Sequence, residues 1–274
     1  MASTGTHKHA TQLTSVDPIW NEVRREAEDA AQKEPVLGAF FHSSVLNQPS
    51  LEAAVSHRIA SRLDHGDVPA SLIRQSFEAM LREDETWPTV MRVDLQAVFE
   101  RDPACVRYLE PLLYFKGFHA IQTHRLAHWL LNQGRRDLAL YLQSRSSALF
   151  QTDINPAARI GKGIFLDHAT GLVVGETAVI GDDVSILHGV TLGGTGKEGS
   201  DRHPKIGNGV LIGAGSSILG NIKVGHCSKI AAGSVVLSEV PPCKTVAGVP
   251  AKVVGEAGCS EPSRAMDQML GRNG

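Results

Sequence analysis

The 274-residue sequence lacks a strong excess of charge, a long apolar run and a dense set of cysteines, and each absence excludes a class of protein. A net charge of −2 leaves no basic surface of the kind that attracts nucleic acid. No stretch of about 18 uninterrupted apolar residues occurs, and the polar start has no signal pattern. We therefore expect a cytoplasmic protein with neither membrane nor nucleic-acid partners.

Cysteine is scarce and irregularly spaced. The four cysteines are Cys105, Cys227, Cys243 and Cys259. They form no C-x-x-C pair and are too sparse for a disulfide framework in a chain of this length. We expect free thiols in a reducing compartment.

Aromatic residues are nearly absent from the second half of the chain, and glycine is scarce in the first. Of the 14 aromatic residues only Phe165 lies beyond position 150, whereas 22 of the 27 glycines do. Such a break predicts two differently built domains, over residues 1–152 and 153–255. Residues 256–274 form a C-terminal tail whose role the sequence leaves open.

The first half shows helical periodicity interrupted by helix start and stop signals, and Gly134 stands where a helix would end. The expected helices are one opened by Asp17-Pro18 and closed by Pro35, then 36–46, 50–64, 69–83, 89–101, a short one starting at Asp102-Pro103, 118–132 and 135–150. His119, His124 and His128 lie in one of them, the last two at a spacing that could hold a metal. Because no Cys, Asp or Glu stands beside them, we expect ordinary surface or interface histidines.

From Ile154 the sequence divides into groups of six. Seven hexads run over 154–195 and six more over 206–241, and Ile, Leu or Val leads 12 of the 13, the exception being Ala178. Three short strands and three tight turns would make one triangular coil of about 18 residues, with the leading aliphatic side chains stacked inside. Such a narrow prism has little room for rings, and its turns favour glycine, which explains the split in composition.

The repeat is interrupted by ten polar residues, GKEGSDRHPK, between Thr195 and Ile206. An extruded loop over 195–205 has no core to build, and such loops often carry function. It holds Arg202 beside His203. Asp167-His168 lies in an earlier hexad.

Six longer segments combine into a more specific pattern. They are DPAC (102–105), PLLYFKGFHA (111–120), HWLLNQGRR (128–136), DINPAARIGKGIFLDHATGLVVGETAVIG (153–181), TLGGTGKEGSDRHPKIG (191–207) and AGVPAKVVG (247–255). Over roughly residues 15–255 the chain closely resembles bacterial serine O-acetyltransferase, of the hexapeptide-repeat acyltransferases. The resemblance implies an α+β protein: an all-α oligomerisation domain followed by a left-handed parallel β-helix.

The resemblance also implies an activity: acetyl transfer from acetyl-CoA to the hydroxyl of L-serine, the first step of cysteine biosynthesis from serine. The family works by direct attack in a ternary complex, without acyl-enzyme or metal, and is inhibited by L-cysteine. Its assembly is a trimer, paired through the helical domains into a hexamer.

Individual residues match the family's site. His168 matches the general base and Asp153 the carboxylate that orients it, with capping of the β-helix as the alternative for Asp153. Asp102 and Asp167 match the carboxylates that receive the substrate ammonium. For Asp102 a helix start is the alternative, compatible with that role.

The remaining matches concern the loop and the co-substrate. Arg202 and His203 match loop residues that reach the substrate carboxylate from an adjacent subunit. The Gly194 amide matches an oxyanion donor. The acetyl-CoA contacts carried over from the family are Gly194, Thr195, Ala214 and Ala232.

The sequence raises three alternatives and departs from the family in one respect. His188, His226 and Cys227 raise a zinc site, but the histidines are too widely spaced in sequence, so no metal is expected. The acceptor could be another hydroxyl, or the protein could be a regulatory scaffold for O-acetylserine sulfhydrylase. Well-studied family members end in an isoleucine that binds this partner, whereas this chain ends in Gly274, so weak or absent binding is expected.

Overall fold

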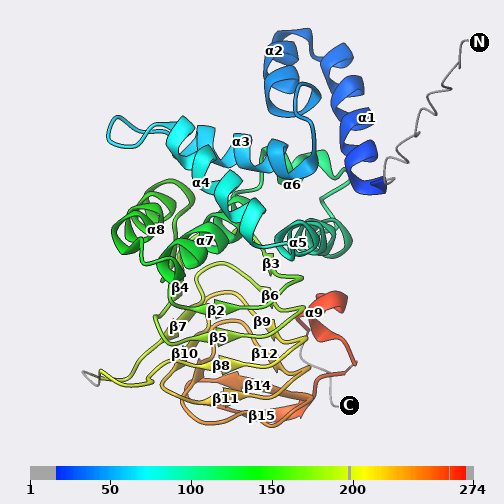
Figure 1. Cartoon of the computed structure of the whole chain (residues 1–274). Helices are drawn as coiled ribbons and strands as arrows, with labels where there is room; N and C mark the ends of the chain where they lie inside the picture. Colours follow the sequence, from blue (N-terminus) through cyan, green and yellow to red (C-terminus); the bar gives the residue numbers. More distant parts are fainter. Residues whose placement is uncertain (1–16, 197–198, 259, 270–274) are drawn as a thin grey trace, which may run out of the picture.

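A computed structural model of the chain shows a helical region followed by a column of short parallel strands (Figure 1). It describes residues 17–196, 199–258 and 260–269. The expectations for residues 1–15 and for Gly274 lie outside the described residues. The expected all-α region followed by a β-helix is confirmed.

The helical region packs around a core that contains most of the aromatic side chains, among them Phe77, Phe118 and Phe150. As expected, Asp17 caps the first helix by accepting a hydrogen bond from the Trp20 amide (3.1 Å). The elements in chain order are α1 (Pro18–Lys33), η1 (Pro35–Leu37), α2 (Gly38–Phe41), η2 (His42–Leu46), α3 (Leu51–Leu63), α4 (Ala70–Glu83), α5 (Trp87–Arg101), α6 (Leu109–Leu113), α7 (Lys116–Asn132) and α8 (Arg136–Phe150).

Two helix predictions were wrong in detail. The segment 36–46 is not one α-helix but a 3₁₀ turn, one α turn and a π turn. Asp102-Pro103 starts no helix, because the Asp102 amide closes the last turn of α5 on Val98 O (3.0 Å). The Asp102 carboxylate instead accepts from the Ala104 amide (2.9 Å), which makes a turn, and α6 begins only at Leu109.

The second region is a parallel β-solenoid of about five turns, whose three faces we call sheets A, B and C. Sheet A holds β1 (Thr152–Ile154), β4 (Leu172–Val174), β7 (Thr191–Gly193), β10 (Ser217–Leu219) and β13 (Val235–Val236). Sheet B holds β2 (Arg159–Ile160), β5 (Val179–Ile180), β8 (Lys205–Ile206) and β11 (Lys223–Val224). Sheet C holds β3 (Phe165–Leu166), β6 (Ser185–Ile186), β9 (Leu211–Ile212), β12 (Lys229–Ile230), β14 (Lys244–Gly248) and the antiparallel β15 (Ala251–Glu256).

The strand register corrects the phase of the hexads after Leu166. Ile154 pairs with Val174, 20 residues on, whereas Val174 pairs with Leu192, only 18 residues on. The first turn of the solenoid is therefore two residues longer, and the extra residues lie in the corner before Leu172. Over 172–195 the residues that stack on the later leading aliphatics are Val174, Ile180, Ile186 and Leu192. Leu172, Ala178, Val184 and Val190, two positions earlier, are also buried.

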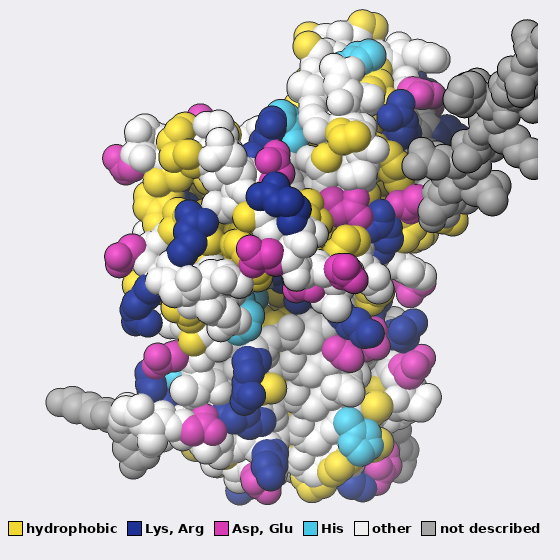
Figure 2. Space-filling model, viewed as in Figure 1, with side chains coloured by type: hydrophobic (Ala, Val, Ile, Leu, Met, Phe, Trp, Pro, Cys, Tyr) yellow, Lys and Arg dark blue, Asp and Glu magenta, His cyan; other side chains and the backbone are white. Residues whose placement is uncertain are grey.

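Helices α5 and α7 pack directly on the first turn of the solenoid (Figure 1). Gly117 of α7 lies so close to β3 that an added Cβ would overlap Leu166 O. The short helix α9 (Pro262–Ala265) returns from the far end of the solenoid and contacts α5 and β9. Figure 2 shows acidic and basic side chains interspersed over both regions, as the near-neutral charge predicts. None of the described helices combines the length and apolarity that a membrane crossing requires.

Candidate active site

The extra residues of the first turn widen the corner between sheets C and A, at residues 167–171. The φ angle is positive at His168 (54°), Ala169 (57°) and Gly171 (74°). A left-handed conformation costs about 1–3 kcal/mol at a residue with a side chain and persists only where the surrounding structure enforces it. Two backbone bonds do so here, from the Asp167 amide to Ile186 O (2.9 Å) and from the Gly171 amide to Gln151 O (2.8 Å). The His168 side chain projects outward and is 75% exposed.

His168 borders a hollow of about 460 Å³ between this corner and the helical region. Asp102, which follows α5, and Asp167 line the same hollow. A second hollow, of about 320 Å³, shares all three residues. His168 Nε2 lies 3.7 Å from Asp167 Oδ1. The structure therefore brings together the expected base and the two expected ammonium-binding carboxylates.

Burial raises the pKa of Asp167, and the nearby Asp102 carboxylate raises it further. The imidazoles of His168 and His188 act in the opposite direction without cancelling the effect. Two carboxylates that share a poorly solvated site resist ionising together, and a cation between them relieves both. The pair of Asp102 and Asp167 is thus suited to bind an ammonium group.

His188 is a neighbour that the sequence did not single out for this site. Its ring lies 5.9 Å from that of His168 in an edge-on arrangement. It stands at the same corner one turn later, because Gly189 N bonds Thr170 O (2.7 Å). The hexad frame, which lacked the two extra residues, obscured this alignment.

The same corner continues down the solenoid. Gly215 N bonds His188 O and Gly233 N bonds Ala214 O, which places Ala214 and Ala232 below His188 in successive turns. Two of the expected acetyl-CoA contacts therefore lie in line with His168, on the corner between sheets C and A.

The extruded loop leaves from a different corner, between sheets A and B. There the His203 ring lies against Gly175, where an added Cβ would overlap Cδ2 and Nε2 of the ring. The Thr177 amide donates to His203 Nδ1 (3.1 Å), so Nδ1 is an acceptor and the neutral ring carries its proton on Nε2. Burial lowers the pKa of His203, and the charges of Arg202 and Lys205 lower it further. His203 is thus held as a neutral donor.

Three further predicted residues share this corner with His203. Arg202 is held by Glu176, with Nη2 donating to Oε2 at 2.8 Å. Gly194 lies beside Arg202, since an added Cβ would stand 3.4 Å from Arg202 Cγ. Thr195 packs toward the next turn at Gly220. Sequence reasoning missed Thr177, whose hydroxyl accepts from the Arg202 amide (3.0 Å) and so fixes the loop base.

Asp153 lies apart from His168 within one chain. It sits in the middle of β1, and its Oδ1 accepts a hydrogen bond from Gln143 Nε2 of α8 (2.6 Å). It borders a separate hollow beside α8. Among the contacts of the described residues, its pairing with His168 does not occur within the single chain.

Apart from Asp102 and Asp153, the predicted residues lie in two groups, at the corners where the strands of sheet A begin and end. The corner between sheets C and A carries Asp167 and His168 with Ala214 and Ala232. The corner between sheets A and B carries Gly194, Thr195, Arg202 and His203. A three-residue strand such as β4 separates these two corners by about 10 Å. A single chain therefore presents two separate groups of predicted residues.

The three histidines of α7 have structural roles. His119 is fully buried, contrary to the expected surface or interface position, and its Nε2 lies 2.7 Å from Leu112 O. His124 is also buried, and burial lowers the pKa of both rings to about 3. His128 meets the solenoid at Pro156 O (2.7 Å), as expected of an interface residue.

Known protein families match parts of both the helical region and the solenoid. A family described as "Serine acetyltransferase, N-terminal" matches residues 19–123, and "Bacterial transferase hexapeptide (six repeats)" matches residues 203–238. The serine acetyltransferase of Escherichia coli (strain K12) is 55% identical over 250 residues, which cover 91% of this chain and 92% of that one. That of Haemophilus influenzae is 51% identical over 250 residues, covering 91% and 94%.

Solved structures match over the same extent. Serine acetyltransferase from Brucella abortus strain S19, in complex with coenzyme A, is 69% identical with a TM-score of 0.88. The match covers 89% of this chain and 98% of that one. A serine acetyltransferase in complex with cysteine is 51% identical with a TM-score of 0.90, covering 92% and 98%.

Proposed function

Because the chain belongs to the serine acetyltransferase family, we propose that it transfers the acetyl group of acetyl-CoA to the hydroxyl of L-serine, giving O-acetyl-L-serine and CoA. The observation that carries the proposal is the grouping of His168 with Asp102 and Asp167 around one hollow. It supplies a base beside a site for an ammonium ion. The coenzyme A complex of the 69% identical relative supports acetyl-CoA as the co-substrate.

His168 would act as the general base. Its imidazole takes the serine hydroxyl proton while the oxygen attacks the thioester carbonyl, and the resulting imidazolium returns a proton to the departing CoA thiolate. An exposed ring at a rigid corner can meet both partners without backbone movement. The Gly194 amide would stabilise the oxyanion of the intermediate.

Each of the two groups of residues would be a half-site, and the complementary half-site of a neighbouring copy of the chain would complete it. We place the serine ammonium between Asp102 and Asp167 of one copy, and its carboxylate on Arg202 and His203 of the next. Arg202 can grip a carboxylate with two parallel hydrogen bonds, and neutral His203 can donate from Nε2. Asp153 of the neighbour would then orient His168.

The same arrangement places the co-substrate along the groove between copies. Ala214 and Ala232 of one copy would face Gly194 and Thr195 of the other, so that small residues line both walls. A trimer has three such grooves, and pairing through the helical regions would give the expected hexamer. The cysteine complex of the 51% identical relative supports inhibition by L-cysteine, which resembles serine in size and charge.

The test is serine-dependent release of CoA from acetyl-CoA by the purified protein. We expect release with L-serine but not with homoserine or a sugar. His168→Ala should lower kcat by about two to four orders of magnitude. Its melting temperature should change little because the ring is mostly exposed.

His226→Ala provides a matched control, since His226 is an exposed histidine of the solenoid away from both half-sites. It should keep wild-type turnover. An unimpaired His168→Ala would overturn the mechanism. Absence of turnover by the purified wild type would instead favour the regulatory scaffold. Weak or absent binding of O-acetylserine sulfhydrylase and a cytoplasmic location stay predictions.

A further inference from the structure

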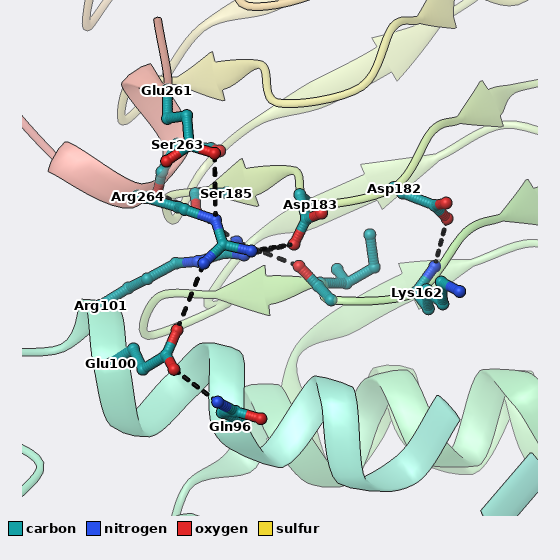
Figure 3. Close-up of polar contacts among 12 residues, drawn as sticks. Gln96, Glu100, Arg101, Lys162, Asp182, Asp183, Ser185, Glu261, Ser263 and Arg264 are labelled. Carbon is teal, nitrogen blue, oxygen red and sulfur yellow. Dashed lines mark hydrogen bonds and ion pairs between the residues drawn. The ribbon is translucent and has the colours of Figure 1, made fainter. Parts of the chain in front are cut away.

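The last residue of α5, Arg101, is a buried cation that the proposed chemistry does not use. Its side chain is only 1% exposed. Nη1 donates to Gly163 O (3.0 Å) and to Ser185 Oγ (3.2 Å), and Nη2 donates to Asp183 Oδ1 (2.8 Å). All three acceptors belong to the first two turns of the solenoid, so Arg101 ties the end of a helix to the β-helix (Figure 3).

The acceptors of Arg101 are themselves held in place. Ser185 Oγ donates its single proton to Ser263 O (2.7 Å), which leaves a lone pair directed at Arg101. Arg264 of α9 lies 3.4 Å from the same Asp183 oxygen, as Figure 3 shows. These bonds favour one orientation of the guanidinium, because breaking one would leave a further buried nitrogen unsatisfied beside Nε, which already has no hydrogen-bond partner among the described residues.

A second buried ion pair anchors α5 at the same corner of the solenoid. Asp94, two turns before Arg101 on the same helix face, is fully buried and accepts from the Ile164 amide (3.1 Å) and from Arg125. Asp94 thus anchors the middle of α5 to the solenoid, and Arg101 anchors its last turn. The residue that follows is Asp102.

We propose that Arg101 is a positioning residue for substrate binding: it holds Asp102 opposite Asp167 so that the two carboxylates can share one ammonium group. The inference rests on the proposed function and adds a residue to it. Arg101 also borders the smaller hollow, but its side chain is only 1% exposed, both Nη atoms are bonded to the solenoid and its Nε is buried, so we expect no direct bond to the substrate. Its effect on the substrate therefore passes through Asp102.

The test compares Arg101→Met with Arg101→Lys in steady-state kinetics. Arg101→Met should raise the KM for L-serine by about 10- to 100-fold, the equivalent of a lost hydrogen-bonded charge contact. The KM for acetyl-CoA should stay within about twofold, since Ala214 and Ala232 lie further along the solenoid. Arg101→Lys keeps a cation for Asp183 and should recover part of the loss.

Arg92→Met is the matched control on the same helix. Arg92 pairs with Asp17 and Glu52 within the helical region, and among the described residues no hydrogen bond or ion pair joins it to the solenoid. Both methionine variants should lower the melting temperature. Only Arg101→Met should change the KM for serine, and equal changes in both would overturn the proposal.

A double-mutant cycle with Asp102→Asn provides the sharpest outcome. If Arg101 acts through Asp102, adding Arg101→Met to Asp102→Asn should produce no further rise in the KM for serine. Additive effects would show that Arg101 acts independently and would overturn the inference. Failure of the proposed function is distinguishable, because the wild type itself would then lack serine-dependent turnover.

Discussion

At the scale of single residues, Asp167 is where stability and function oppose each other. The side chain is 23% exposed, and burial beside Asp102 raises its pKa. A carboxyl whose pKa rises on folding binds its proton more tightly in the folded state. Its contribution to stability is therefore present at low pH and is lost as the pH rises through the raised pKa. At neutral pH the ionised group destabilises the fold, and a bound ammonium would offset this.

Asp167→Asn should consequently separate the two effects. We expect a higher melting temperature than wild type at neutral pH, with the difference shrinking in acid, where Asp167 is protonated in the wild type. The KM for L-serine should rise about tenfold as a charged partner of the ammonium is lost. Thermal melts across pH and initial rates would measure both.

Asp137→Asn, at an exposed aspartate of α8, is the control and should leave the KM unchanged. If Asp167→Asn melted at a lower temperature than wild type at neutral pH, this would contradict the inference that the ionised Asp167 carboxylate destabilises the fold.

At the scale of elements, the corners of the solenoid decide where chemistry can occur. The interior of the solenoid repeats aliphatic side chains from turn to turn, so it offers few groups that could take part in a reaction. The two extra residues before Leu172 project His168, and the extruded loop before β8 delivers Arg202 and His203. The loop base is fixed by the fit of His203 against Gly175 and Thr177.

Gly175→Ala tests that fit. Gly175 is absent from the residues with positive φ, so its backbone accepts alanine, but the new Cβ would occupy the place of the His203 ring. We expect the ring to be displaced and kcat/KM for serine to fall about tenfold or more. Adding His203→Ala should cost nothing further.

Gly66→Ala, where an added Cβ meets nothing within 4 Å, is the control. If Gly175→Ala and His203→Ala reduced kcat/KM additively, the contact between them would not be the route of the effect.

At the scale of the whole molecule, the separation of the two half-sites by sheet A favours a shared site between copies. Asp167 and His168 lie at the corner between sheets C and A with Asp102 beside them, whereas Arg202 and His203 lie at the corner between sheets A and B. A ring of identical copies brings unlike corners of neighbouring copies together, which is the geometry of a heterologous interface.

Mixed oligomers provide the measurement. His168→Ala and Arg202→Ala should each be nearly inactive alone. Co-expressed in equal amounts, they should recover about a quarter of wild-type activity, because one interface in four then pairs an intact His168 with an intact Arg202. Mixing the two after separate purification, without subunit exchange, is the control and should recover nothing. No recovery on co-expression would place each site within one chain.

Much of the fold was predictable because helices and the solenoid each have a characteristic periodicity in the sequence. Helical spacing and the Asp17-Pro18 signal predicted α1, and the hexads predicted the solenoid. The phase after Leu166 was not predictable, because a two-residue insertion leaves apolar residues in either frame buried. The end of α5 at Arg101 was predicted, but the turn that follows was not, because Asp102-Pro103 is as good a helix start as a turn.

The sequence by itself determined the family, the two kinds of domain and the residue types of the site, because these depend on local pattern and on long matched segments. Only the tertiary structure decided which residues stand together. Asp102 joins Asp167 across 65 positions through the packing of α5 on the first turn, and Asp153 does not reach His168 in the same chain. The physical reason is that the direction in which each corner of the solenoid points depends on how successive turns stack, and stacked residues are distant from one another in the sequence.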